Sequence, residues 1–346
     1  MSKIRIGVTG INAVDNPGPG VGVIRSVKED GELDVEAIGL AYDAMDPGVY
    51  MDWLVDRAYI LPYPSGNEAD FLSRIRYIKG ETDLDLLVPT LDTELPVFIN
   101  AAKELEEMGI RTFLPTKSQY DLRNKTRLEE VAANLGLAYP ASRTVTSHQE
   151  LAGAIEALGF PVMIKGLFYR AHCATTWQQA AGFFDSVVAE WGYPVIVQQV
   201  VTGDEMNVIG VGDGKGGDLG QVAIKKLCIT SLGKIWTGVT VRNERVLKAS
   251  REFVGNYRWK GGFELECIAA ADDVYLIEIN PRFPAWVYFA TGVGVNLPAR
   301  LVRAALDLPV ERNGDYEAGK LYVRYTYDLV TDLSMLRSVA TKAERS

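Results

Sequence analysis

The sequence contains few of the residues from which metal and redox centres are usually built. Its 346 residues include three cysteines and two histidines. Cys173, Cys228 and Cys267 stand far apart, and no Cys-x-x-Cys pair occurs. This spacing indicates neither a zinc site nor a disulfide framework, and it is typical of free thiols in a reducing compartment.

Positive charge is also in the minority. Lysine and arginine number 36 against 45 aspartates and glutamates, which gives a net charge of −9. This balance argues against a nucleic-acid partner held by bulk electrostatics, although a local basic cleft stays possible. No apolar run reaches membrane-spanning length, and the first residues lead into a strand pattern without a signal peptide. We therefore expect a cytoplasmic protein with no nucleic-acid and no membrane partner.

Alternating strand and helix patterns fill the first part of the chain. Such alternation predicts a mostly parallel, doubly wound α/β domain over residues 1–118. Hydrophobic residues make up 47% of the chain and charged residues 23%, as in ordinary globular proteins, and the length allows two or three domains. The expected strands are 3–9, 35–40, 57–61, 84–89 and 111–114, and the expected helices include 67–78 and 95–108.

Two features of this first domain have an open role. The stretch Gly18-Pro19-Gly20-Val21-Gly22 resembles half of a dinucleotide-binding turn, but the prolines and the spacing break the pattern, which favours a structural role. Asp92-Thr93-Glu94 follows the end of an expected strand, where open α/β sheets bind ligands. The same three residues are equally suited to cap the following helix.

Two smaller α+β units and a tail follow the first domain. The patterns predict units over 119–194 and 195–310, then a C-terminal strand and a polar end over 311–346 that we expect to be mobile. The expected elements are a helix at 125–135 that ends at Gly136, a strand at 161–165, a loop at 166–175, a helix at 176–189, and strands at 195–201, 205–211, 221–229, 234–241 and 320–325.

A hairpin with acidic residues is the most informative segment. Two apolar runs, 263–269 and 274–279, flank a polar turn at 271–273, which predicts an antiparallel hairpin. Because side chains alternate along a strand, Glu264 and Glu266 share one face, Glu278 and Asn280 share another, and Glu266 can meet Glu278 across the pair.

Acids among apolar residues need a compensating cation. Magnesium suits them, because it takes one or two carboxylates together with substrate phosphates. A solvated edge hairpin is the alternative. Arg282, just beyond the second strand, favours the magnesium interpretation because a guanidinium matches phosphate or carboxylate oxygens.

Two lysines precede the hairpin. Lys165 closes the apolar run 160–164, so its stem should be buried while its ammonium emerges at a strand end. A phosphate would balance that charge. Lys125, in a first helical turn, would by itself be read as a solvated lysine.

The order and spacing of these segments resemble the ATP-grasp superfamily, which includes carbamoyl phosphate synthetase and D-alanine–D-alanine ligase. The resemblance rests on Lys125, the run 160–165 and Ile277-Glu278-Ile279-Asn280-Pro281-Arg282, with Glu266 twelve positions before Glu278. It covers about residues 119–310, and the first 118 residues look like the Rossmann-like domain that precedes ATP-grasp modules. The implied fold is a Rossmann-like pre-ATP-grasp domain followed by a two-subdomain α+β ATP-grasp fold.

The resemblance also implies site residues. ATP and Mg²⁺ are the implied cofactors, with Glu266, Glu278 and Asn280 on the metal and Lys125 and Lys165 on the α- and β-phosphates. Many members have Glu-Glu where this chain has Gln198-Gln199. One of Lys225 and Lys226 at most can face the cleft, and we take Lys226 as the candidate for the γ-phosphate. Around the nucleoside, Gln198, Gln199 and Val201 would line the adenine and Glu205 would take the ribose hydroxyls.

Two positions depart from the family pattern. Trp236 stands where carbamoyl phosphate synthetases carry a histidine that serves the carboxyphosphate intermediate, which argues against that product. The usual Gly/Ser-rich phosphate loop is replaced by bulky residues at 166–175. Arg170 and His172 would supply side-chain donors there, or else the phosphate site is weak or idle. An isolated histidine is more often structural than catalytic.

The activity implied by the resemblance is that of an ATP-dependent carboxylate–amine ligase. A carboxylate would become an acyl phosphate, and an amine of an amino acid or peptide would attack it to form an amide, with Lys125, Lys165 and Arg282 stabilising charge. A nucleotide-binding regulatory or partner protein is the alternative, as is an enzyme with a non-amine acceptor. We expect the acid pocket near the first domain and Arg242, Arg258 and Arg282. The resemblance also implies a possible homodimer.

Overall fold

The computed structural model describes residues 3–13, 17–167, 171–230, 233–311 and 315–345. Contacts divide the chain into two compact units. The larger unit comprises Met1–Tyr120, Asn207–Leu265 and Asn280–Ser346, and the smaller unit comprises Asp121–Met206 and Glu266–Ile279. Among the described residues, no helix combines the length and the apolar character that crossing a membrane requires.

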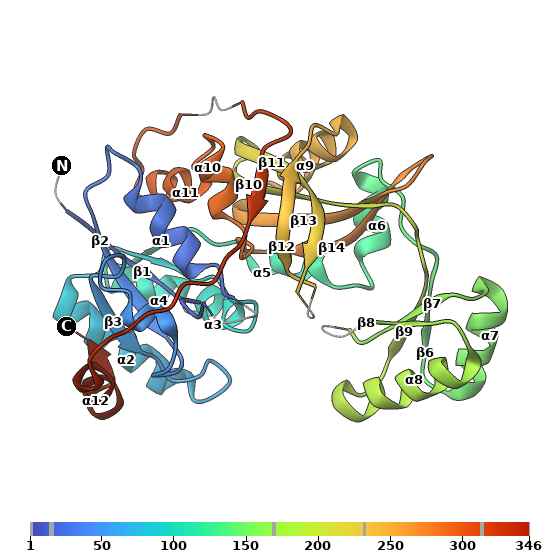
Figure 1. The fold of residues 1–346 in the computed structure, drawn as a ribbon, viewed down its shortest axis with the longest axis horizontal. Helices are drawn as coiled ribbons and strands as arrows, with labels where there is room; N and C mark the ends of the chain where they lie inside the picture. The colour runs from blue at the N-terminus through green and yellow to red at the C-terminus, as the bar shows by residue number, and fades with distance from the viewer. Residues whose placement is uncertain (1–2, 14–16, 168–170, 231–232, 312–314, 346) are drawn as a thin grey trace. The chain divides into compact units, whose positions relative to one another are not determined.

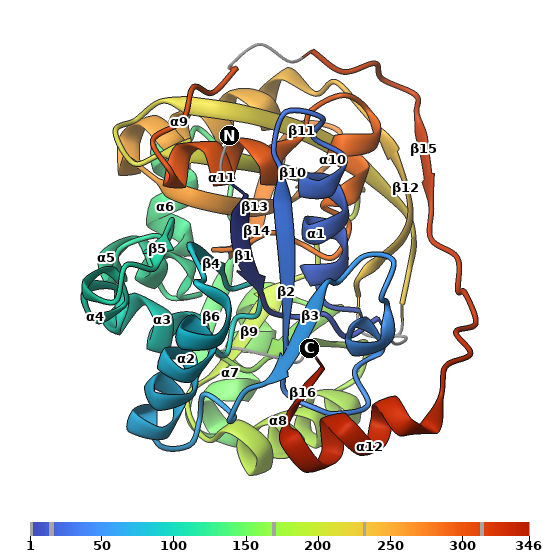
Figure 2. The ribbon, with the colours of Figure 1, turned by 90° about the vertical axis from the view of Figure 1, so that its left-hand side faces the viewer.

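The larger unit begins with the expected parallel sheet. Five strands follow the order β3-β2-β1-β4-β5 and pair in parallel, as in doubly wound folds (Figure 2). Their bounds are β1 Ile4–Val8, β2 Val35–Ala41, β3 Arg57–Ile60, β4 Leu86–Val88 and β5 Arg111–Thr112. The helices among them are α1 Gly20–Lys28, α2 Glu68–Thr82, α3 Leu95–Asn100 and α4 Ala102–Glu107, with a 3-10 turn at Pro47–Tyr50.

A second six-stranded sheet runs in the order β14-β13-β10-β11-β12-β15. The predicted hairpin is confirmed, because β13 and β14 are neighbours in this sheet. The bounds are β10 Asp204–Asp213, β11 Asp218–Ile229, β12 Ile235–Thr240, β13 Lys260–Ala269, β14 Val274–Asn280 and β15 Leu321–Val323. Helices α9 Glu244–Tyr257, α10 Tyr288–Gly292 and α11 Leu297–Ala305 accompany it and were not expected from the sequence.

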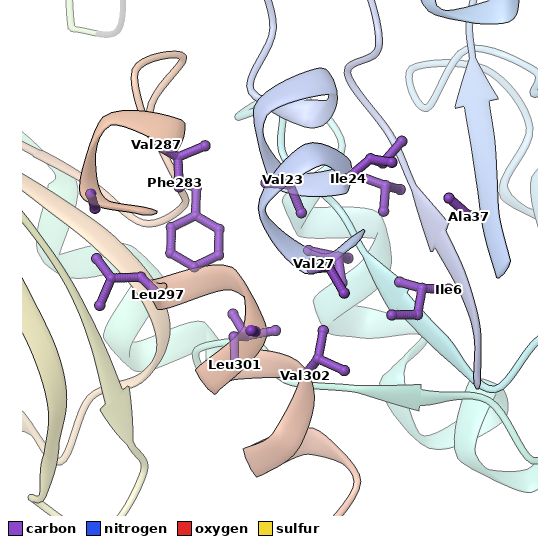
Figure 3. Packing of buried hydrophobic residues seen from close by; sticks show 14 of the residues in the cluster. Ile6, Val23, Ile24, Val27, Ala37, Phe283, Val287, Leu297, Leu301 and Val302 are labelled. Carbon is purple, nitrogen blue, oxygen red and sulfur yellow. The ribbon is translucent and has the colours of Figure 1, made fainter. Parts of the chain in front are cut away.

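Helix α1 joins the two sheets of the larger unit into one core. Figure 3 shows Val23, Ile24 and Val27 of α1 between Ile6 of β1 and the segment that carries Phe283 and Leu301. The glycines before and at the start of α1 permit this close packing. A Cβ on Gly20 would lie 2.1 Å from the Thr9 carbonyl oxygen, so the glycine stretch has the structural role that its spacing favours.

The smaller unit contains a four-stranded antiparallel sheet in the order β6-β9-β7-β8. Helices α7 and α8 accompany it (Figure 1), and both contribute to one core with Val162, Ile164, Val195 and Val197 of the strands. Lys165 and Gln198 alternate with these core residues and therefore belong to the other face. The bounds are α6 Leu128–Asn134, β6 Ser142–Val145, α7 His148–Leu158, β7 Val162–Lys165, β8 Ala171–Ala174, α8 Trp177–Trp191 and β9 Val195–Gln199. Short turns at Lys117–Tyr120 and Asp121–Arg123 precede α6.

Several expected boundaries are wrong. The helix expected from residue 125 begins at Leu128, and Lys125 lies in the turn before it. Gly136 does adopt the left-handed conformation, with φ +64°, as its role as a helix stop requires. The loop expected at 166–175 contains β8, which pairs with β7. The helix expected at 95–108 breaks at Ala101 into α3 and α4.

The C-terminal segment contains a helix and a strand beyond the one expected from the sequence. Helix α12 spans Leu333–Lys342, and β16, Glu344–Arg345, adds an antiparallel strand beside β3 (Figure 2). Val339 is buried in the core of the larger unit, and the Ile60 N–H donates to the Ala343 carbonyl at 2.8 Å. The segment covers an edge of the parallel sheet that would otherwise present unpaired backbone groups.

Arg345 anchors this segment, and its removal should destabilise the protein. Its guanidinium donates to the Val49 and Val55 carbonyl oxygens at 2.6 and 2.5 Å. Because hydrogen bonds from a charged donor stabilise more than neutral ones, Arg345→Ala should lower the free energy of unfolding by about 2 kcal/mol. Urea denaturation measures this, with the exposed Lys342→Ala as the control. Equal stability of the two variants would show that the strand adds nothing.

Candidate active site

Two lysines of the smaller unit lie on elements that hold their ammonium groups firmly. Lys165, at the end of β7, donates to Gln198 Oε1 at 2.6 Å, and Gln198 Nε2 donates in turn to Ser142 Oγ at 2.9 Å. Lys125 Nζ donates to the Gly166 carbonyl at 3.0 Å. Gln198 is buried, so its amide orients Lys165. No local pattern indicates this positioning role, because it depends on the pairing of β9 with β6 and β7.

The electrostatics of this lysine pair are unfavourable in the protein alone. Burial, followed by the charge of Lys125, lowers the pKa of Lys165 to about 8, although Glu278 and Glu266 act to raise it. Burial also lowers the pKa of Lys125, against the effect of Glu278. Two cations and two carboxylates therefore share one region of the smaller unit. An added polyanion would stabilise the charged lysines further.

The two carboxylates come from neighbouring strands of the hairpin. Glu266 lies on β13 and Glu278 on β14, and both are half-buried. The connecting turn is closed by a hydrogen bond from the Ala270 N–H to the Asp273 carbonyl at 2.9 Å. No group of three or more metal-binding side chains occurs within the described ranges. Two carboxylates fit magnesium when phosphate oxygens complete its shell, so these residues fit a metal that arrives with a nucleotide.

Glu264, two residues before Glu266, has a different environment. It is buried in the larger unit and accepts from Asn207 Nδ2 at 2.7 Å, Trp286 Nε1 at 2.7 Å and Asn280 Nδ2 at 3.0 Å. These neutral donors satisfy the carboxylate, which therefore acts as a structural acceptor. Asn280 Oδ1 accepts from Arg282 Nη2 at 3.2 Å. The predicted ligand Asn280 thus links Glu264 to Arg282.

Arg282 is oriented by Asp92 of the first domain. Its Nη2 lies 2.7 Å and its Nε 2.9 Å from Asp92 Oδ2. No side-chain cap bond is formed at the start of α3, so the capping alternative for Asp92-Thr93-Glu94 is wrong. Glu94 is instead a buried acceptor for the hydroxyls of Thr9 and Tyr42 and for the Thr90 and Leu91 N–H groups. Asp92 orients the guanidinium, and Glu94 ties the ends of the strands together.

Lys234 of the larger unit lies within the electrostatic influence of two arginines, Arg282 and Arg324. Lys234 Nζ donates to the Pro17 carbonyl at 2.8 Å, and Arg324 Nη2 donates to the Ala285 carbonyl at 2.8 Å. Burial, then Arg282 and Arg324, lower the pKa of Lys234 to about 8, while Asp92 and Glu264 act to raise it. The sequence analysis placed Lys234 at the start of an expected strand, two residues before Trp236, but gave it no role, and it did not single out Arg324.

Other predicted residues occupy varied positions. Arg242 bonds Asp315 and the Tyr316 carbonyl, and Arg258 is the left-handed residue that ends α9, so neither is brought to Arg282 by these contacts. His172 stacks on Phe183 of α8, with ring centroids 4.6 Å apart, on the face opposite Lys165. This placement indicates a packing role for His172.

The structure places the remaining candidates as follows. Lys226 is half-buried on β11 opposite Gly238. Gln199 and Glu205 are exposed and Val201 is half-buried, as positions along a ligand-binding segment can be. Arg170 lies outside the described residues.

The lowered pKa of Lys165 predicts a specific pH dependence of stability. The folded protein releases this proton near pH 8, whereas an unfolded lysine keeps it to about pH 10.5. The unfolded state therefore binds more protons in this window, and stability rises with pH. From pH 7 to 10 the natural protein should gain roughly 2 kcal/mol relative to Lys165→Met. Urea denaturation of both proteins at several pH values measures the difference, and parallel curves would contradict the assignment.

Comparison with known proteins supports the fold. No family model matches the sequence. Among solved structures, biotin carboxylase from Campylobacter jejuni is 14% identical with a TM-score of 0.68, covering 89% of this chain and 72% of that one. N5-carboxyaminoimidazole ribonucleotide synthetase from Thermus thermophilus is 15% identical with a TM-score of 0.66, covering 91% and 81%. L-amino acid ligase from Bacillus licheniformis is 16% identical with a TM-score of 0.64, covering 88% and 74%. These are ATP-grasp enzymes, and this chain has the ATP-grasp fold.

Proposed function

We propose that the protein is an ATP-dependent ligase that activates a carboxylate as an acyl phosphate and joins it to an amine. The observation that carries this proposal is the gathering of Lys125, Lys165, Glu266 and Glu278 in the smaller unit. Two partly desolvated ammonium groups suit the phosphates of a nucleotide, and two carboxylates suit the magnesium ion that accompanies it.

The nucleotide would bind chiefly through its phosphates. Lys165, held by Gln198, and Lys125, held by the Gly166 carbonyl, would contact the α- and β-phosphates. Glu266, Glu278 and Asn280 would hold magnesium, which neutralises charge that develops as the phosphoryl group moves. Gln199, Val201 and Glu205 would contact the nucleoside. Solved structures with the same fold include one described as a complex with MgADP and bicarbonate, which supports this choice of ligand class.

The chemistry would proceed in two steps. A substrate carboxylate oxygen attacks the γ-phosphorus, and the bond from that phosphorus to the β-phosphate oxygen breaks, which releases ADP. The amine nitrogen then attacks the acyl carbon, phosphate leaves, and the amine loses a proton. Arg282, fixed by Asp92, would stabilise the phosphate charge in both steps, with Lys226 as a further cation. The likeness to L-amino acid ligase supports an amine acceptor.

A catalytically reduced nucleotide-binding protein is the second candidate. Its support is the segment 166–175, which has one glycine and bulky residues in place of a Gly/Ser-rich phosphate loop, together with the packing of His172 on Phe183. Such a protein would bind MgATP without acid-dependent turnover. The choice between the two candidates therefore rests on the release of ADP.

Binding of MgATP should depend on Glu278. In a thermal-shift experiment, MgATP at ~100 times its dissociation constant should stabilise the natural protein by roughly 2.7 kcal/mol. Glu278→Gln removes a charge that magnesium requires, so most of this shift should be lost. The exposed Glu130→Gln on α6 is the matched control and should keep the shift. A full shift in Glu278→Gln, or none in the natural protein, would contradict the nucleotide assignment.

Turnover decides between the two candidates. We expect MgATP with a set of small acids and hydroxylamine to release ADP and form a hydroxamate with at least one acid. Hydroxylamine replaces the unknown amine and traps the acyl phosphate. A protein that binds MgATP but forms no hydroxamate with any acid would favour the non-catalytic candidate.

A further inference from the structure

The sheet that carries the hairpin ends in a strand with an open outer edge. In the part of the chain that the structure describes, β15 is the last strand of this sheet, and β12 is its neighbour. Backbone hydrogen bonds of 2.9 Å join Lys320 and Arg324 to β12. Because antiparallel ladders alternate, Leu321 and Val323 direct their backbone N–H and C=O groups away from β12. Such an edge is a template for pairing with another strand.

The chain beyond β15 keeps the sequence pattern of a strand. Residues 321–333 read Leu-Tyr-Val-Arg-Tyr-Thr-Tyr-Asp-Leu-Val-Thr-Asp-Leu, with an apolar residue at six of the seven odd positions. This alternation is typical of a strand with one apolar face. Residues 321–323 pair with β12, and 324–332 lead to α12 without a turn, a bend or a helix (Figure 2). Both the pattern and the unbent path therefore fit a longer strand.

Large apolar side chains of this segment are exposed. Tyr325 and Tyr327 are 76% and 78% exposed, and Val330 is 98% exposed, whereas Tyr322 packs on Phe289 with ring centroids 5.2 Å apart. A continuous exposed apolar patch on a protein usually marks an interaction surface. We define the edge strip as the exposed side chains of Leu321, Val323, Tyr325, Tyr327, Val330 and Leu333.

The edge strip has an area of the order that a stable dimer needs. From the area that buried aromatic and aliphatic side chains contribute, its six exposed side chains offer roughly 600 Å². A standard protein–protein interface buries about 800 Å² on each partner. The backbone groups of the open edge would supply part of the difference.

The charges along the segment make it complementary to itself. Lys320 and Arg324 precede Thr326, and Asp328 and Asp332 follow it at the same two separations. If two copies pair as antiparallel strands centred on Thr326, Lys320 lies opposite Asp332 of the partner subunit. Arg324 then lies opposite Asp328 of the partner subunit. Two-fold symmetry forms each of these pairs twice.

The same register suits the backbone and the apolar side chains. It pairs odd positions with odd positions, and these are the positions whose backbone groups face the open edge at Leu321 and Val323. It also places Tyr325 opposite Tyr327 of the partner subunit, and cross-strand aromatic and opposite-charge pairs stabilise sheets. Moving the centre to either neighbouring residue would separate all the charge pairs. Charge, backbone direction and apolar pattern therefore agree on one register.

We propose that the edge strip is a homodimer interface, in which residues 320–332 of two copies pair as antiparallel strands about a two-fold axis at Thr326. The occupant of this surface is a second copy of the chain, whose sheet continues that of the first. None of the residues proposed to bind the nucleotide lies in 320–332, so the inference does not depend on the proposed function. Another protein and a membrane surface are the competing occupants.

Sedimentation equilibrium of the full chain tests the proposal. At roughly 100 μM the natural protein should have a mass close to twice the 38.0 kDa of one chain. Lys320→Glu places like charges opposite each other at two points, so the dissociation constant of the dimer should rise about tenfold or more. Asp332→Lys should have the same effect. Lys248→Glu, an equal charge change on the exposed side of α9, is the matched control and should leave the constant unchanged.

Mixing the two variants separates pairing from folding. In an equimolar mixture of Lys320→Glu and Asp332→Lys, the heterodimer again has opposite charges at both points, so association should return nearly to that of the natural protein. Asp332 also caps α12 by accepting from the Ser334 N–H at 2.7 Å, and mixing would not recover the loss of this cap. Tyr327→Asp tests the apolar contact and should also weaken the dimer about tenfold. Met45→Asp, at a similarly exposed position outside the strip, should not.

Three results would overturn the proposal. The first is a natural protein that stays monomeric at roughly 100 μM. The second is a dimer that tolerates Lys320→Glu, Asp332→Lys and Tyr327→Asp, since its interface would then lie elsewhere. The third is a mixture of the two charge variants that dimerises no better than either variant alone. Binding of a monomeric natural protein to phosphatidylcholine vesicles, with its loss in Tyr327→Asp, would assign the edge strip to a membrane surface instead.

Discussion

The cost of removing lysine charge from water governs the smaller unit. Lys125 and Lys165 share a partly buried region, and burial lowers the pKa of each despite the carboxylates of Glu266 and Glu278. Hydrogen bonds to Gln198 and to a backbone carbonyl fix the two ammonium groups in place. The protein alone is therefore less stable than its packing would allow, and a polyanionic ligand would recover that loss. A site that is unfavourable when empty selects ligands that bring the missing charge.

Two carboxylates on one strand show how the environment gives similar residues different roles. Glu264 and Glu266 are separated by a single residue and share a face of β13. Glu264 is surrounded by the amides of Asn207 and Asn280 and the indole of Trp286, and their neutral donors satisfy it. Glu266 acts instead on the charge of Lys165. One acid thus maintains the structure around Arg282, while the other influences the charge of a lysine. Their distinction lies in partners distant in the sequence.

The sequence predicts the strands better than it predicts the helices and the C-terminal segment. Apolar runs bounded by turn residues located the parallel sheet and the hairpin, because local pattern and final burial agree there. Helices α7 and α9 were missed even though Ser147 and Asn243 cap them, since a cap is recognisable only once a helix is expected. The C-terminal segment was taken as mobile because it is polar. Its last strand pairs with β3, which lies nearly three hundred residues earlier, and no local pattern reveals this pairing.

The candidate site likewise contains residues that the sequence reveals and residues that it does not. Lys165 and the hairpin acids could be found from the sequence because each interrupts an apolar run, where a charged side chain needs a compensating charge. Lys234 and Arg324 interrupt nothing, and their significance arises only when β15 pairs with β12 and brings their segments together. The side chain of Trp236 departs from the family pattern, but its backbone carbonyl accepts a hydrogen bond from the Arg324 N–H and so positions Arg324.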